Sequence, residues 1–178
     1  MSLDVVAVEG FTRGRLNRDD DETQRQLDAA LAAARNYCGW HVSPVAVGEQ
    51  ITLDGTGTSV LVLPTLKVTD LIEVEEDGAT LELTDLSWSE RGLILKKSGH
   101  WWSAMFRSIT VTFSHGYSSA PDFDSVILSA IERGAFSSDS APRVIGPFQY
   151  SDPGNADAVL FTDSERAVLD RYALEKTP

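Results

Sequence analysis

The spacing of apolar positions near the N-terminus is helical. Apolar residues recur every three or four positions within an alanine-rich stretch, at Leu27, Leu31, Ala34 and Cys38. Acidic residues at 19–22 precede this stretch, and Asp21 is a suitable N-cap with Gln24 three residues later. Gly39 suits a helix end, because glycine tolerates the left-handed conformation common there. The pattern therefore predicts a helix over residues 21–38.

The middle of the chain changes to short runs that are typical of β-strands. The predicted strands, in chain order, are 50–53, 59–63, 68–76, 79–83, one near Trp88, 93–95 and 109–113. The first two flank the glycine-containing turn 54–57, and the next two flank Asp77-Gly78, which is a strong turn signal. We therefore expect six or seven short antiparallel strands that include two hairpins.

Helical spacing returns after Pro121, where Phe123, Ile127, Ala130 and Ile131 share one face, and predicts a helix over 122–136. The stretch 137–156 is rich in Ser, Asp, Gly and Pro and predicts a long loop or arm, interrupted by two aromatic residues. Residues 162–165, Thr-Asp-Ser-Glu, form a capping box and predict a short C-terminal helix. A helix this short is marginal alone, so we expect it to dock on its own core or on a neighbour.

These elements predict an α+β fold with an N-terminal helix, central antiparallel strands and hairpins, a second helix, an extended arm and a short C-terminal helix. A chain of 178 residues suits one compact domain with mobile ends. We expect a single α+β domain over 1–136, with helix 21–38, strands over about 50–113 and helix 122–136. The arm and C-terminal helix take up 137–178.

Charge and composition narrow the possible partners. The net charge is −12, from 15 Lys and Arg against 27 Asp and Glu, which argues against electrostatic capture of nucleic acid. No apolar run approaches the roughly 20 residues that span a bilayer, so we expect no membrane partner. The first residues lack the basic region of a secretory signal, and we expect a soluble protein made in the cytoplasm.

Few residues in the sequence suggest catalysis, metal binding or cofactor binding. Cys38, the only cysteine, falls among apolar helix positions and suits a buried hydrophobe. The three histidines, His41, His100 and His115, are not spaced as metal ligands, and no motif points to a cofactor or a catalytic residue. Ser114-His115 lacks the context of a nucleophile elbow. The aromatic segment Trp101-Trp102, with Met105 and Phe106 nearby, suits core or intersubunit packing, or a binding platform if exposed.

Several segments resemble, in order, one family of phage proteins. The segments are 11–16, 27–31, 35–44 (Arg-Asn-Tyr-Cys-Gly-Trp-His-Val-Ser-Pro), 52–57, 60–64, 85–89, 107–117, 146–148 and 169–172. They are similar to head-to-tail adaptor, or connector, proteins of actinobacterial siphophages, a head-completion family of the phage neck. Each piece alone is weak, but their order over most of the chain makes the resemblance fairly specific.

The resemblance implies a structural virion protein that is made in the bacterial host and catalyses nothing. Its subunits would form a ring, typically twelvefold, below the portal protein and would attach a tail-side neck or tail-terminator protein. Genomic DNA would pass through the ring without specific binding. The arm and closing helix would engage the portal, with Phe148, Tyr150, Phe161, Leu169 and Tyr172 as candidate anchors. Two turns are candidates for the tail-facing loops, at Asp54, Gly55 and Thr56 and at Asp77 and Gly78.

Three alternatives stay open. The arm could be a disordered connection between two packed helices. The chain could be a small β-rich carbohydrate- or protein-binding module that uses Trp88, Trp101 and Trp102 as a platform. It could also be a hydrolase built on Ser114, His115 and an acid.

Overall fold

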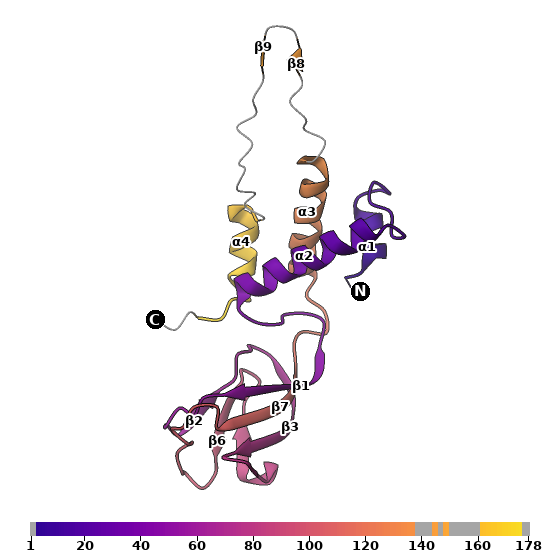
Figure 1. The fold of residues 1–178 in the computed structure, drawn as a ribbon. Coiled ribbons are helices and arrows are strands. Elements are labelled where there is room, and N and C mark those ends of the chain that lie inside the picture. Colours follow the sequence, from indigo (N-terminus) through magenta and orange to yellow (C-terminus); the bar gives the residue numbers. More distant parts are fainter. Residues whose placement is uncertain (1–2, 138–143, 146–147, 150–160, 176–178) are drawn as a thin grey trace. The chain divides into compact units, whose positions relative to one another are not determined.

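The computed structural model describes residues 3–137, 144–145, 148–149 and 161–175, and it confirms the predicted α+β class. The chain forms two compact units (Figure 1). The helical unit comprises Met1–Tyr37 and Pro121–Arg171, and the β unit comprises Cys38–Ala120 and Tyr172–Pro178. The helical unit thus combines helices from both ends of the chain. A separate role for 137–178 stays a prediction.

Four helices belong to the helical unit: α1 (Val5–Phe11), α2 (Asp21–Cys38), α3 (Pro121–Ser137) and α4 (Asp163–Leu169). The predicted bounds of α2 are confirmed, and those of α3 are correct to within one residue. The prediction that Asp21 caps α2 is wrong: Asp20 does so, since its Oδ1 accepts from the amide of Glu22 at 3.0 Å. The sequence did not predict α1, whose first turn is capped by Asp4.

The core of the helical unit forms around α3, which packs against α1 and α4. Buried apolar residues of this unit include Val8 in α1, five residues of α3, and two at the C-terminal end of the unit: Val8, Phe123, Val126, Ile127, Ala130, Ile131, Phe161 and Leu169. The short strands β8 (Val144–Ile145) and β9 (Phe148–Gln149) pair antiparallel to each other.

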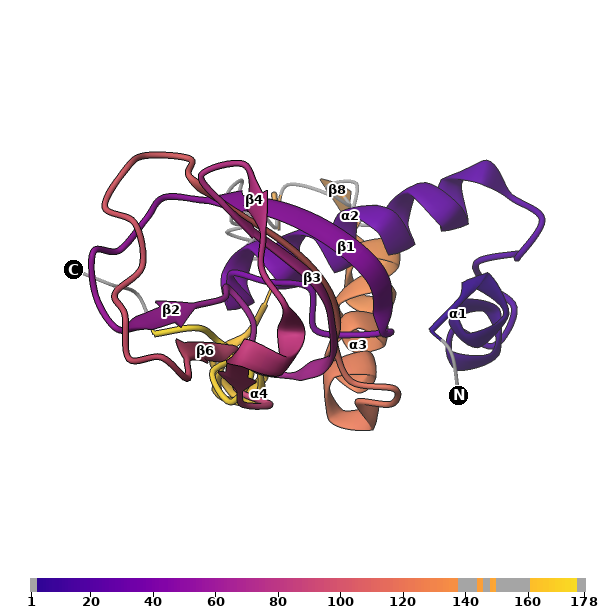
Figure 2. The same ribbon diagram turned by 90° about the horizontal axis from the view of Figure 1, so that it is seen from below.

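The β unit consists of two antiparallel sheets. The four-stranded sheet has the order β1 (Ala46–Leu53), β7 (Ile109–His115), β3 (Val68–Glu76), β4 (Ala79–Thr80). The three-stranded sheet has the order β2 (Val60–Val62), β6 (Leu93–Lys96), β5 (Leu86–Trp88), and a short 3-10 helix, Leu83–Asp85, precedes β5. Figure 2 shows the curved strands β1 and β3 of the four-stranded sheet apart from β2 and β6 of the other sheet. Both sheets contribute to one core. Its buried residues are Leu61, Leu63, Val68, Leu71, Val74, Leu86, Ile94, Trp102, Ile109, Val111 and Phe113.

One predicted hairpin is confirmed and the other is wrong. Asp77 and Gly78 have φ of +51° and +79°, and they turn the chain so that Glu76 pairs with Ala79. The strands on either side of 54–57 do not pair with each other: β1 pairs with β7, and β2 pairs with β6. The turn at 54–57 hydrogen-bonds to the segment after β6. These bonds direct β2 away from β1 and into the other sheet.

Candidate docking surface

The most exposed apolar residues of the β unit include three in the segment between β6 and β7. Trp101, Met105 and Phe106 are 71%, 67% and 85% exposed, and we call Trp101–Phe106 the apolar loop. Trp102 points the other way: it is 2% exposed, and its indole Nε1 donates to the carbonyl of Ile94 at 3.3 Å. The sequence singled out this aromatic segment, and the structure divides it between the core and the surface.

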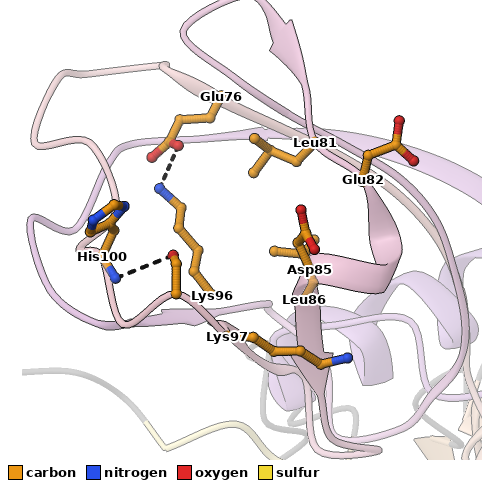
Figure 3. A pocket seen from close by; sticks show the side chains of 9 residues that line it. Glu76, Leu81, Glu82, Asp85, Leu86, Lys96, Lys97 and His100 are labelled. Atoms are coloured by element: carbon orange, nitrogen blue, oxygen red, sulfur yellow. Dashed lines mark hydrogen bonds and ion pairs between the residues drawn. The ribbon is translucent and has the colours of Figure 1, made fainter.

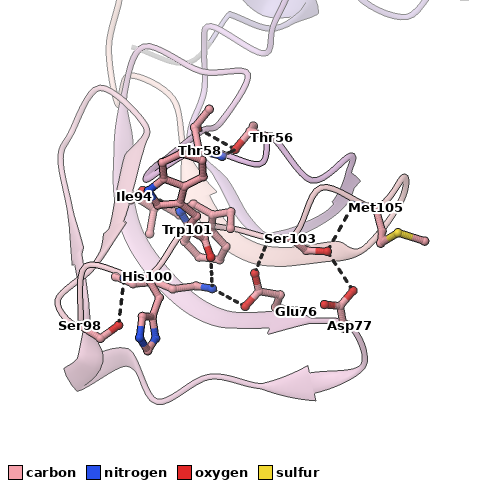
Figure 4. Close-up of polar contacts among 12 residues, drawn as sticks. Thr56, Thr58, Glu76, Asp77, Ile94, Ser98, His100, Trp101, Ser103 and Met105 are labelled. Carbon is pink, nitrogen blue, oxygen red and sulfur yellow. Dashed lines mark hydrogen bonds and ion pairs between the residues drawn. The ribbon is translucent and has the colours of Figure 1, made fainter.

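Hydrogen bonds to two neighbouring segments fix the backbone of the apolar loop (Figure 4). The amide of Trp102 donates to the carbonyl of Thr58 at 2.8 Å. The amide of Ser103 donates to Oε1 of Glu76 at 2.7 Å, and its hydroxyl donates to Asp77 Oδ1 at 3.2 Å. Because the backbone is already held, little conformational freedom would be lost when the exposed side chains bind a partner.

The turn residues chosen from the sequence lie beside this loop and support it. The amides of Gly55 and Gly57 donate to the carbonyls of Met105 and Ser103 at 2.8 and 3.0 Å. Asp54 accepts from the amide of Arg107 at 2.8 Å. A Cβ on Gly55 would lie 2.1 Å from the carbonyl oxygen of Ser103, so only glycine permits this approach.

The other chosen turn residues differ in what they contact. The hydroxyl of Thr56 lies 3.0 Å from that of Thr58, within its own turn. Asp77 reaches the loop as described, whereas Gly78 lies at the open tip of the hairpin, where a Cβ would meet nothing within 4 Å. The structure thus brings both chosen turns to one end of the β unit, and the apolar side chains between them offer the larger contact area.

A partly buried ion pair anchors the base of the loop. Lys96 Nζ lies 2.5 Å from Glu76 Oε2, and both side chains are 14% exposed. The same ammonium group donates to the carbonyl of Trp101 at 3.1 Å and lies 4.6 Å from the ring centroid of Trp102. A partly buried charge with several partners is costly to disturb, so this cluster fixes the loop against β3 and β6. No sequence pattern indicated the pair, since its members are 20 residues apart.

The ion pair also lines a pocket of about 580 Å³ (Figure 3). Its walls comprise Glu76, Leu81, Glu82, Asp85, Leu86, Lys96, Lys97, Ser98 and His100. The second lysine of the pocket, Lys97, donates to the carbonyl of Thr84 at 2.7 Å. Both lysines of the pocket therefore have partners within the chain.

The C-terminal candidate anchors fall into three groups. Phe161 and Leu169 are 5% and 0% exposed and belong to the core of the helical unit. Tyr172 belongs to the β unit, where its carbonyl accepts from Trp40 Nε1 at 2.6 Å and its ring contacts that of Tyr117 edge to face. Phe148 lies in β9, and Tyr150 lies outside the described residues.

The capping box predicted at 162–165 is confirmed, and it links α4 to α3. Thr162 Oγ1 accepts from the amide of Glu165, whose carboxylate accepts in return from the amide of Thr162 at 2.7 Å. Arg133 of α3 donates twice to the same carboxylate, at 3.0 and 2.7 Å. Burial alone would raise the pKa of Glu165, but the hydrogen bonds from Arg133 and Thr162 outweigh it and lower the pKa.

Ser114 and His115, the candidate hydrolase pair, have separate partners. Ser114 Oγ accepts from the amide of Gly48 at 3.2 Å. The ring of His115 lies between Thr65 Oγ1 at 3.1 Å and Glu49 Oε2 at 3.0 Å. This hydroxyl–imidazole–carboxylate order resembles a catalytic triad, but Thr65 is only 1% exposed and its hydroxyl offers no access for a substrate. The arrangement instead ties β1 and the segment before β3 to the end of β7.

The structure also places the residues of the proposed tryptophan platform and the single cysteine. Trp88 is 40% exposed, but the burial of Trp102 removes one ring from the predicted three-tryptophan platform. Cys38 is buried, as predicted. Within the described part of the chain, no group of three His, Cys, Asp or Glu is placed to hold a metal ion. In the same part, no helix has the length and apolar character needed to cross a membrane.

The comparisons with known proteins give one result, a likeness of fold. No protein-family model matches the chain, and no curated protein sequence matches it. Among solved structures, the chain is similar to one described as "Neck of empty GTA particle computed with C6 symmetry", where GTA stands for gene transfer agent, a phage-like particle. The TM-score is 0.55 at 14% identity, and the match covers 100% of this chain and 95% of that chain.

Proposed function

We propose that this chain is a structural subunit of the neck of a phage-like particle. In this proposal it is a ring-forming head-to-tail adaptor that docks below the portal, extends the DNA channel and attaches the tail-side neck or tail-terminator protein. The observation that carries the proposal is the fold likeness to a chain from a neck, which extends over nearly the full length of both chains. The ordered sequence resemblance to head-to-tail adaptors supports the same assignment.

The apolar loop and the acidic composition agree with this role. An adaptor works through contacts with other proteins, and a preorganised loop with exposed Trp, Met and Phe side chains has the composition of such contacts. A net charge of −12 would also keep DNA from adhering to the wall of a passage. We assign the chain no catalytic reaction, and the engagement of Ser114 and His115 within the sheet supports that choice.

The proposed portal contact falls on residues 143–156 of the arm and not on the core of the helical unit. Phe161 and Leu169 are covered by their own chain, so they would position α4 and leave Phe148, Tyr150 and half-buried Tyr172 as the candidate anchors. Internal deletion of the arm residues between Ser137 and Phe161 should then abolish binding to the portal without unfolding the β unit. Pull-down with purified portal rings would measure this effect.

Cryo-electron microscopy of the particle whose genome encodes the chain tests the proposal directly. We expect a ring of this chain between the portal and the tail. The sixfold symmetry used for the neck of the similar structure differs from the twelvefold order that the resemblance implies, so the copy number should be counted in the map. Absence of the chain from the neck would contradict the proposal and favour a protein-binding module.

A further inference from the structure

The outward faces of the two sheets in the β unit differ in their share of polar residues. On the four-stranded sheet the outward residues are mostly polar, and exposed Val47 and Ile72 are apolar exceptions. The polar ones are Gln50 and Thr52 of β1, Glu73 and Glu75 of β3, and Thr110 and Thr112 of β7. On the three-stranded sheet the outward residues are Val60 and Val62 of β2, Leu93 and Leu95 of β6, and Ser87 of β5. An antiparallel sheet with one solvated face normally alternates apolar and polar residues, as the first sheet does. The second sheet does not.

We call Val60, Val62, Leu93 and Leu95 the apolar face. Their neighbours Leu61 and Ile94 point inward and are 1% and 0% exposed, while Val62, Leu93 and Leu95 remain 58%, 42% and 42% exposed. Strands that are apolar at every position are typical of sheets covered on both sides. β2 and residues 93–95 of β6 follow this pattern, which Lys96 ends. This part of the sheet therefore fits a covering layer that this chain, as described, does not supply.

Charge limits where a second copy of the chain could bind, and the apolar face and the apolar loop both meet that limit. Two copies that each carry −12 repel one another, so they can meet only where carboxylates are few. Neither the apolar face nor the apolar loop contains an ionisable side chain. A different protein with basic residues would instead match the acidic outward face of the four-stranded sheet.

The available area suits one part of a ring contact. The loop of one copy and the face of the next together offer on the order of 700 Å², about half of the roughly 1,600 Å² that both partners of a stable complex bury in total. A ring is a heterologous assembly, in which one patch of each subunit meets a different patch of the next. The β unit has two different uncharged apolar patches, one a supported loop and the other a sheet face.

We propose that the apolar loop of one copy docks on the apolar face of the next copy. This contact rests on the proposed ring function and adds to it the two surfaces that meet between neighbours. Trp101 and Phe106 would be the main anchors, because large exposed aromatic side chains contribute most at interface centres.

Site-specific cross-linking tests the contact in rings assembled by the full-length chain with its portal. Met105→Cys and Val62→Cys variants are mixed and treated with a short bismaleimide, and buried Cys38 stays in place. We expect a dimer linked between positions 105 and 62. As a matched control, Met105→Cys mixed with Thr52→Cys, on the polar sheet face, should give no such dimer.

The two proposals fail in different ways. A ring that forms without the 105–62 cross-link would overturn the contact and leave the adaptor function standing. The cross-link in a chain that is absent from the particle neck would support the contact and overturn the function.

Charge substitution supplies a second readout. Phe106→Asp should reduce ring formation at least tenfold while leaving the circular dichroism spectrum unchanged, because the side chain is 85% exposed. Val47→Asp is the matched control, since Val47 is 81% exposed in β1 and belongs to neither patch. Normal rings of Phe106→Asp, or rings lost only with Val47→Asp, would overturn the contact. Normal rings that fail to join tails would assign the loop to the tail-side protein and would also overturn it.

Discussion

Gly55 lies where the turn before β2 touches the apolar loop. A Cβ there would approach the carbonyl oxygen of Ser103 to 2.1 Å and Ser108 Oγ to 2.8 Å, so the backbone must shift in any variant. We expect Gly55→Ala to lower the free energy of unfolding by about 2 kcal/mol, as for overpacked sites. Urea unfolding followed by tryptophan fluorescence would measure the change.

The matched control for that substitution is Gly134→Ala in α3. A Cβ at Gly134 would meet nothing within 4 Å, and alanine is favoured over glycine within a helix by up to about 1 kcal/mol. We expect this variant to be as stable as the parent chain or more so. Equal stability of Gly55→Ala and the parent would contradict the close approach at Ser103.

Trp101 and Trp102 offer a second comparison, because adjacent identical residues have opposite environments. Trp102 is 2% exposed within the β-unit core, and Trp102→Ala should cost about 3–5 kcal/mol of unfolding free energy. Trp101 is 71% exposed, and Trp101→Ala should change stability by less than about 0.5 kcal/mol. Chemical denaturation of both variants, followed by circular dichroism, tests the assignment, and similar losses for the two would contradict it.

Among the elements, α4 depends on its cap and on the ion pair with α3. The pKa of Glu165 is below its ordinary value of 4.5, so the folded chain binds fewer protons there than the unfolded chain. The stabilisation is therefore present above about pH 4.5 and is lost as the pH falls below it. Glu165→Gln should cost about 1 kcal/mol at pH 7, and the difference from the parent should shrink towards pH 3. A difference that stays constant with pH would contradict this account.

The sequence was sufficient for elements that local signals determine. The helical periodicity predicted α2, the Asp77-Gly78 turn predicted the hairpin between β3 and β4, and the capping box predicted α4. It failed for the pairing of β2, since a strand of three residues carries little information about its partner. The hydrogen bonds that decide this pairing join the 54–58 turn to a loop nearly 50 residues later.

The candidate surface was predictable only in part, for a similar reason. The sequence indicated an aromatic segment and two turns, but not that the turns flank that segment or that Trp101 and Trp102 face opposite ways. The Glu76–Lys96 pair had no local signal, because long-range ion pairs depend on tertiary structure. The apolar face was visible as continuous apolar runs, yet its exposure requires the strand order.

At the scale of the whole molecule, the two units have separate probes. All four tryptophans, at positions 40, 88, 101 and 102, lie in the β unit, whereas the α-helices lie almost wholly in the helical unit. Three buried residues of the helical unit are alanines, whose side chains bury less area than those of the β-unit core: Ala30, Ala34 and Ala130. We expect ellipticity at 222 nm to be lost at lower urea than tryptophan fluorescence. Coincident transitions would show that the chain unfolds as one cooperative unit.

Because the chain is strongly acidic, the salt dependence of ring assembly shows which kind of contact joins the copies. Apolar contacts would form more readily as salt rises, whereas ion pairs would weaken. Copies that carry −12 repel one another, and at about 0.1 M salt this repulsion is screened beyond roughly 10 Å. A contact between the apolar loop and the apolar face contains no ion pair for salt to weaken. Raising NaCl from about 0.02 to 0.5 M should therefore lower the protein concentration needed for assembly several-fold, as measured by analytical ultracentrifugation. Dissociation by salt would mean that ion pairs, and not these two apolar surfaces, join the copies.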